Sequence, residues 1–161
     1  EAVPIMELCH RYNVPLIIND RVNVAAEIHA DGVHIGQSDM DAAKARKILG
    51  PDSIIGVTAK TVEQALKAQA EGADYLGSGA VFGTTTKSDA KPMDIDTLNA
   101  ICDSVDIPVV AIGGINNDNV MKLSGSRIAG IAVVSGIFDN KDIKGAAQSL
   151  RAKALNIISG R

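Results

Sequence analysis

Short apolar runs alternate with amphipathic stretches along the whole chain. Six runs rich in β-branched residues predict strands, at 15–19, 32–35, 53–57, 74–81, 108–112 and 128–134. Each run is nearly continuous rather than alternating, which is typical of parallel strands buried on both faces. A strand followed by a helix every 20 to 30 residues or so indicates an α/β protein built from βα units.

The stretches around these runs carry apolar residues at helical spacing. They predict helices at 4–12, 22–28, 40–49, 61–71, 95–102, 117–123 and 142–158. Asp39 is placed to cap the helix at 40–49, and Gly72 follows the helix at 61–71, where a C-terminal glycine is favoured. With 161 residues, 46% of them hydrophobic, the chain can bury a sizeable core. We expect residues 1–161 to form a single domain.

Two architectures suit six parallel βα units: a TIM (β/α)8 barrel and a flavodoxin-like open sheet. Gly113-Gly114 follows the fifth run and Ser135-Gly136 follows the sixth. Barrels often bind phosphate after strands 7 and 8, so these glycines favour the barrel. The six runs then correspond to strands 3–8. We expect an N-terminally truncated barrel, with on the order of 50 residues missing before residue 1.

The composition of the chain argues against several classes of function. The net charge is −3, aromatic residues make up 2% of the chain, and Lys and Arg form no run, which argues against a nucleic-acid partner. No apolar stretch approaches the roughly 20 residues that span a membrane, and no secretory signal opens the chain. Cys9 and Cys102 lack metal or disulfide spacing, which favours reduced thiols and a cytoplasmic location.

Carboxylates follow two neighbouring runs. Asn19-Asp20 ends the first run and Asp39 follows the second. Adjacent strands lie about 4.8 Å apart, so both carboxylates are expected near one point, where they repel unless a cation lies between them. Mg²⁺ is the natural choice, since one or two carboxylates plus substrate phosphates bind it. The alternative for each site is an N-cap of the following helix.

Hydroxyl groups and an ammonium group follow the next two runs. Thr58 ends the third run, and a polar loop with Thr84, Thr85, Thr86 and Lys87 follows the fourth. Such a loop suits a phosphate group, because hydroxyls donate hydrogen bonds and Lys supplies a compact cation. Instead of binding phosphate, the Thr58 hydroxyl could form a local hydrogen bond within a turn, and Thr84–Thr86 could simply belong to a solvated loop.

Signatures of other chemistries are weak or missing. His10, His29 and His34 lack the spacing of a zinc site, and no GxSxG motif occurs. His34 lies inside a predicted strand, where a hydrogen-bonded core histidine is expected. Gly77-Ser78-Gly79 lacks the third glycine of a dinucleotide site. The metal and phosphate residues therefore remain the main candidates.

Six segments between Pro15 and Ile137 match a known family in order: PLIINDRVNVA, ADGVHIGQSD, IIGVTAK, GADYLGSGAVFGTTTK, IPVVAIGGI and IAVVSGI. The chain resembles the thiamine-phosphate synthases, also called thiamine-phosphate pyrophosphorylases, which are TIM barrels. These Mg²⁺-dependent transferases join 4-amino-2-methyl-5-hydroxymethylpyrimidine diphosphate to a thiazole phosphate, with or without a carboxyl group. The products are thiamine phosphate and pyrophosphate, in the biosynthesis of thiamine diphosphate.

The resemblance implies roles at the diphosphate. Asp20 and Asp39 match the Mg²⁺ ligands, and Asn19, Thr58 and Lys87 match contacts to the pyrimidine diphosphate. Asp20, Asp39 and Lys87 are the implied catalytic residues, acting on charge at the leaving pyrophosphate. The family's Gln-x-Arg-x-Lys strand, which also grips the diphosphate, is absent from this sequence and is expected before residue 1.

The resemblance also implies a second phosphate site. The residues that match contacts to the thiazole phosphate are Thr84, Thr85, Thr86, Gly114, Val134 and Ser135. The implied partners are the two small-molecule substrates, with a homo-oligomer as a further option. Two other functions stay open: a thiazole tautomerase-like enzyme of the same superfamily, and a non-catalytic protein that binds phosphate ligands.

Overall fold

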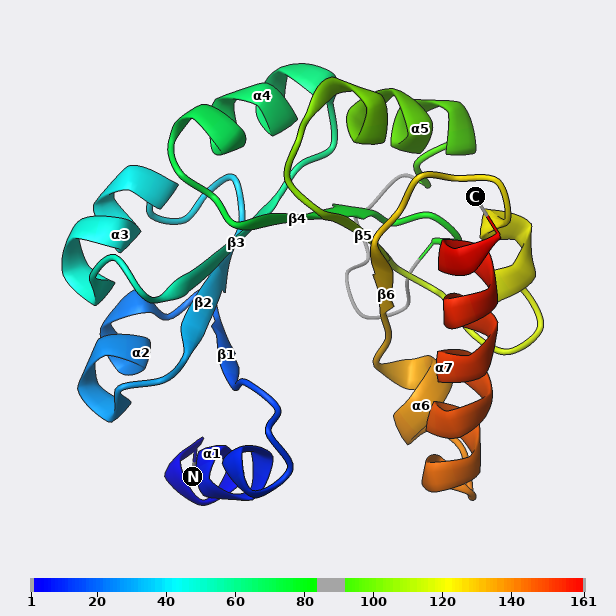
Figure 1. The fold of residues 1–161 in the computed structure, drawn as a ribbon, viewed down its shortest axis with the longest axis horizontal. Coiled ribbons are helices and arrows are strands. Elements are labelled where there is room, and N and C mark those ends of the chain that lie inside the picture. The colour runs from blue at the N-terminus through cyan, green and yellow to red at the C-terminus, as the bar shows by residue number, and fades with distance from the viewer. Residues whose placement is uncertain (1, 84–91, 161) are drawn as a thin grey trace.

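A curved sheet of six parallel strands forms the centre of the molecule (Figure 1). The computed structural model describes residues 2–83 and 92–160. The strands are β1 (Ile17–Asn19), β2 (Gly32–Ile35), β3 (Ile54–Thr58), β4 (Tyr75–Gly79), β5 (Val109–Ile112) and β6 (Gly130–Ala132). Their order in the sheet is β1-β2-β3-β4-β5-β6, which is barrel-like and excludes the flavodoxin-like order. The fold is therefore an α/β half-barrel.

Helices surround the curved sheet, most of them on its convex side, with α1 (Ala2–Arg11) beyond its β1 edge. The others are α2 (Val22–Ile28), α3 (Ala42–Leu49), α4 (Val62–Ala70), α5 (Ile95–Ser104), the 3-10 helix η1 (Val120–Leu123), α6 (Ser135–Phe138) and α7 (Ile143–Ser159). Apart from η1, the ends of the predicted strands and helices move by no more than two residues. Within the described residues, no helix is long and apolar enough to cross a membrane.

The prediction of a helix over residues 117–123 is wrong. Its first part is an asparagine turn, in which the Asn119 side chain accepts from Asn116 N–H at 2.9 Å and the Asn116 side chain accepts from Asp118 N–H at 2.9 Å. Side-chain bonds of this kind replace helical backbone bonds, so only the short η1 forms. The four-residue α6 was not predicted, because one turn is too short to show a period.

The two faces of the sheet differ in exposure, whereas the apolar runs predict burial on both. Ile35, Ile55 and Leu76 face the helices and are at most 1% exposed. Residues on the concave face, such as Tyr75 and Val110, are only partly buried, and Ile112 is 38% exposed. The difference follows from the arc of helices, which packs on one side of the sheet only.

The cap of α3 is Asp41 rather than Asp39. The Asp41 side chain accepts from Lys44 N–H at 2.8 Å and forms an ion pair with the Lys44 ammonium, also at 2.8 Å. By contrast, Gly72 ends α4 as predicted, with a φ of +88° in the region that glycine tolerates best.

Asp41→Ala is expected to lower the free energy of unfolding by about 1 kcal/mol, because an N-terminal N–H of α3 loses its acceptor. Urea denaturation measures this loss. Asp52→Ala serves as the control, since Asp52 lies in an exposed turn and caps no helix. Equal stability of the two variants would contradict the capping role.

Candidate functional site

A cavity of about 600 Å³ lies at the carboxyl ends of the strands. Every strand contributes to its wall: Asp20 after β1, Gly36–Asp39 after β2, Thr58 and Lys60 from β3 and its loop, Gly79 and Ala80 from β4, Gly113–Ile115 after β5, and Val133–Ser135 after β6. Parallel strands bring their carboxyl ends to one edge, so residues far apart in sequence meet there.

Most of the predicted site residues that the structure describes line this cavity. They are Asp20, Asp39, Thr58, Gly114, Val134 and Ser135. Asn19 is the exposed last residue of β1 and does not line it. Thr84, Thr85, Thr86 and Lys87 lie outside the described residues. One cavity thus gathers both the carboxylate residues and the glycine loop that the sequence predicted separately.

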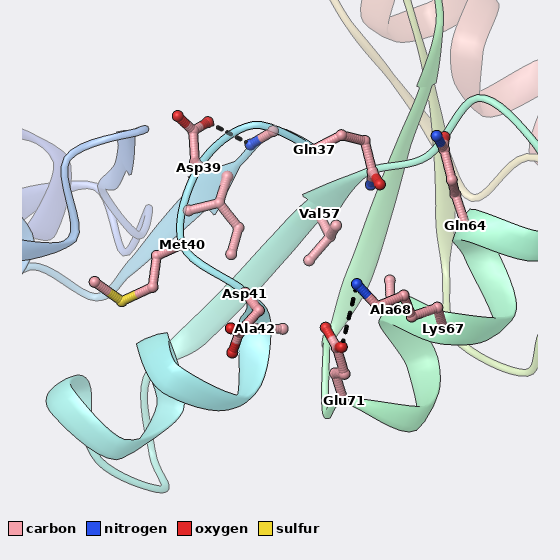
Figure 2. Close-up of a pocket in the computed structure, with 12 residues that line it drawn as sticks. Gln37, Asp39, Met40, Asp41, Ala42, Val57, Gln64, Lys67, Ala68 and Glu71 are labelled. Atoms are coloured by element: carbon pink, nitrogen blue, oxygen red, sulfur yellow. Dashed lines mark hydrogen bonds and ion pairs between the residues drawn. The ribbon is translucent and has the colours of Figure 1, made fainter.

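Neither Asp20 nor Asp39 caps a helix. The residue at the cap of α2 is Arg21, without a side-chain cap bond. Asp20 has a φ of +63°, and its N–H donates to the His34 carbonyl at 2.7 Å across the β1–β2 edge. The Asp39 carboxylate accepts from Gly36 N–H at 2.7 Å (Figure 2). Within residues 2–83 and 92–160, neither carboxylate forms an ion pair, so both keep oxygen atoms for a cation.

These residues fit one kind of metal site. The described part of the chain holds no group of three or more His, Cys, Asp or Glu that could hold a metal ion. Two carboxylates from neighbouring strands suit Mg²⁺, which commonly takes one or two protein carboxylates and completes its shell with water and substrate phosphates. The donor set therefore fits a Mg²⁺ shared with a diphosphate, and not a metal held by the protein alone.

The opposite wall of the cavity is backbone. Gly113 and Gly114 follow β5 with φ values of +101° and +64°. A Cβ on Gly114 would lie 2.4 Å from the Gly83 carbonyl oxygen, so only glycine fits. Asn119 Nδ2 donates to the Gly114 carbonyl at 2.8 Å and holds the loop in place. Exposed backbone N–H groups in such turns suit an anion such as phosphate.

Sequence reasoning missed four polar residues of the cavity wall, which are Gln37, Ser38, Lys60 and Gln64. Gln37 Nε2 donates to the Thr58 carbonyl at 2.6 Å, and Gln64 Oε1 accepts from Lys60 N–H at 2.8 Å. The available signal for Lys60 was its place two residues after Thr58, just past the end of a strand.

A smaller crevice of about 230 Å³ lies between α3 and α4 (Figure 2). It shares Gly36, Gln37, Asp39 and Gln64 with the main cavity. In its wall on the α4 side, the Lys67 ammonium lies 3.5 Å from the Glu71 carboxylate. Because the two hollows share walls, the crevice is a side extension of the same site.

A parallel βα sheet with its polar residues and glycine loops gathered at the carboxyl ends defines a TIM-barrel type of enzyme site. The chain belongs to the thiamine monophosphate synthase family, whose model matches residues 1–137. The family predicted from the sequence is confirmed. Neither the thiazole tautomerase nor the non-catalytic binding protein is favoured.

Individual relatives agree with this assignment. The thiamine-phosphate synthase of Ruminiclostridium cellulolyticum is 54% identical over 149 residues, which cover 92% of this chain and 71% of that protein. Thiamine-phosphate synthase 2 of Streptococcus pneumoniae is 49% identical over 158 residues, which cover 98% of this chain and 75% of that protein. The solved structure of thiamine phosphate pyrophosphorylase from Pyrococcus furiosus superposes with a TM-score of 0.89 at 39% identity. The superposition covers 97% of this chain and 75% of that one.

Proposed function

We propose that this protein joins 4-amino-2-methyl-5-hydroxymethylpyrimidine diphosphate to a thiazole phosphate or carboxythiazole phosphate. The products are thiamine phosphate and pyrophosphate, and the carboxylated form of the thiazole also releases CO₂. The observation that carries the proposal is the division of one cavity. The carboxylates of Asp20 and Asp39, which form no ion pair with the described residues, lie on the β1–β2 side, and the Gly113-Gly114 backbone lies on the β5–β6 side. One side suits a metal-bound diphosphate and the other a second phosphate.

On the carboxylate side, Asp20 and Asp39 would hold Mg²⁺ through their free oxygen atoms. When bound, Mg²⁺ supplies positive charge that stabilises the leaving pyrophosphate. Thr58 and Lys87 are proposed contacts to the pyrimidine diphosphate, and so is Asn19, which ends β1 beside Asp20 although it does not line the cavity. The Lys87 ammonium would add charge stabilisation as the bond to the methylene carbon breaks. The thiazole nitrogen then forms the new bond to that carbon, and the reaction needs no general base from the protein.

On the glycine side, Gly114, Val134 and Ser135 would hold the thiazole phosphate, together with Thr84, Thr85 and Thr86. Gly114 offers backbone in a turn where no Cβ fits, and Ser135 adds a hydroxyl group. Fixing this phosphate orients the thiazole ring, and such positioning can contribute several kcal/mol to catalysis.

The six strands correspond, in this proposal, to strands 3–8 of an eight-stranded barrel, within a single domain over 1–161. The sequential strand order and the glycine loops after β5 and β6 support this numbering. A cytoplasmic location fits the wide separation of Cys9 and Cys102 in the sequence.

The test is Mg²⁺-dependent release of pyrophosphate by the full-length chain in the presence of both substrates. We expect release only when the pyrimidine diphosphate, the thiazole phosphate and Mg²⁺ are all present. If thiazole phosphate binds by calorimetry but no pyrophosphate appears, the protein is a phosphate-ligand binder and the proposal is wrong.

A further inference from the structure

A chain of three side chains crosses the concave face of the sheet below the cavity. The Tyr75 hydroxyl of β4 lies 3.0 Å from His34 Nδ1 of β2, and His34 Nε2 lies 3.0 Å from Thr58 Oγ1 of β3. Of the three, Thr58 lines the cavity, whereas His34 and Tyr75 are not part of its wall. The chain therefore ends on the substrate side in a single hydroxyl group.

Two glycines make room for this chain. A Cβ on Gly77 would lie 2.9 Å from His34 Cε1, and a Cβ on Gly56 would lie 2.1 Å from Tyr75 Cζ. The strand register places Gly56 between His34 and Tyr75, with which it pairs on either side. Both rings can thus reach across the strands only because these two positions carry no side chain.

The tautomer of His34 decides the direction of the protons along this chain. Burial raises the pKa of Tyr75, so its phenol keeps its proton at neutral pH. Within the described residues, His34 is the partner that the structure gives this hydroxyl. If the phenol donates to Nδ1, the neutral imidazole carries its proton on Nε2 and donates to Thr58 Oγ1. The Thr58 proton is then free to point into the cavity.

The opposite tautomer of His34 would prevent the Thr58 hydroxyl from donating a hydrogen bond into the cavity. His34 Nε2 would then accept the Thr58 proton, and the hydroxyl would show only lone pairs to the cavity. Lone pairs repel the oxygen atoms of a phosphate, whereas an O–H group donates to them. The backbone of Thr58 is held separately, because Gln37 Nε2 donates to the Thr58 carbonyl at 2.6 Å.

We propose that His34 is a positioning residue which, oriented by Tyr75, keeps the Thr58 hydroxyl as a hydrogen-bond donor to the pyrimidine diphosphate. This inference rests on the proposed function, because it assumes that Thr58 contacts that substrate. It goes further by assigning a direction to the Thr58 proton and a role to two residues outside the cavity wall.

Steady-state kinetics of the full-length chain test this relay. Thr58→Val and His34→Asn are each expected to lower kcat/KM for the pyrimidine diphosphate by about tenfold or more, as for loss of a hydrogen bond to a charged group. The KM for the thiazole phosphate should not change. His34→Gln should restore most of the activity, since its amide nitrogen can take the place of Nε2, whereas the shorter Asn side chain cannot reach Thr58. Tyr75→Phe should give an intermediate loss.

A double-mutant cycle separates positioning from a purely structural role. If His34 acts through Thr58, His34→Asn should have no further effect on kcat/KM in a Thr58→Val background. Additive losses, or equal losses for His34→Gln and His34→Asn, would overturn the relay while wild-type turnover still supported the proposed function. Lack of turnover by the wild-type protein would instead overturn the proposed function, and the relay with it.

Discussion

Asp20→Asn is expected to lower the rate of pyrophosphate release by on the order of a hundred- to a thousandfold, the usual range for loss of one charge-stabilising group. The same variant should bind thiazole phosphate as the wild-type protein does, because the Gly114 side of the cavity is untouched. Asparagine is the suitable replacement because it tolerates the φ of +63° at residue 20 and leaves only the charge changed. Asp39→Asn should behave alike, since its amide oxygen can still accept from Gly36 N–H.

The measurement is kcat as a function of Mg²⁺ concentration, with calorimetry for the thiazole phosphate. Both variants should need more Mg²⁺ for half-maximal rate. Asp52→Asn is the matched control, because it removes one carboxylate from an exposed turn that does not line the cavity. Wild-type turnover and Mg²⁺ dependence in Asp20→Asn would remove that residue from the proposed ligands.

Arg46→Met is expected to lower the free energy of unfolding by about 1 to 2 kcal/mol, since several partly buried or exposed acceptors lose one shared charged donor. The Arg46 guanidinium donates to the carbonyls of Ser53 and Gly72 and to the Asp74 carboxylate, the last at 2.7 Å. Asp74 in turn accepts from Ile55 N–H at 2.6 Å. One side chain of α3 thus ties together the segments that lead into β3 and β4.

Urea denaturation measures this effect, and Lys47→Met is the control on the neighbouring, exposed position of α3. Arg46→Lys should recover little of the stability, because an ammonium group cannot span the same set of acceptors. The network lies at the amino ends of the strands, away from the cavity, so the folded Arg46→Met variant should keep its KM values. If it proves as stable as Lys47→Met, the network contributes nothing to folding.

The sequence predicted the repeating elements well and the local bonds at their ends less well. Apolar runs rich in β-branched residues identified all six strands, because such a run is a local property of the sequence. The cap of α3 was misplaced by two residues, since Asp39 and Asp41 are chemically alike and only the path of the chain distinguishes them. Residues 117–123 do not form the predicted helix, because asparagine side chains accept hydrogen bonds from the backbone N–H groups.

For the site, the sequence by itself determined which chemical groups end each strand: the carboxylates after β1 and β2 and the glycines after β5. Those groups depend only on local order along the chain. Only the tertiary structure decided that they face one cavity, that Gln37 and Lys60 join them, and that Tyr75, His34 and Thr58 form one chain of hydrogen bonds. The His34–Tyr75 contact spans 41 positions in sequence. Its existence depends on strand register and on the space left by Gly56 and Gly77, which no local pattern reveals.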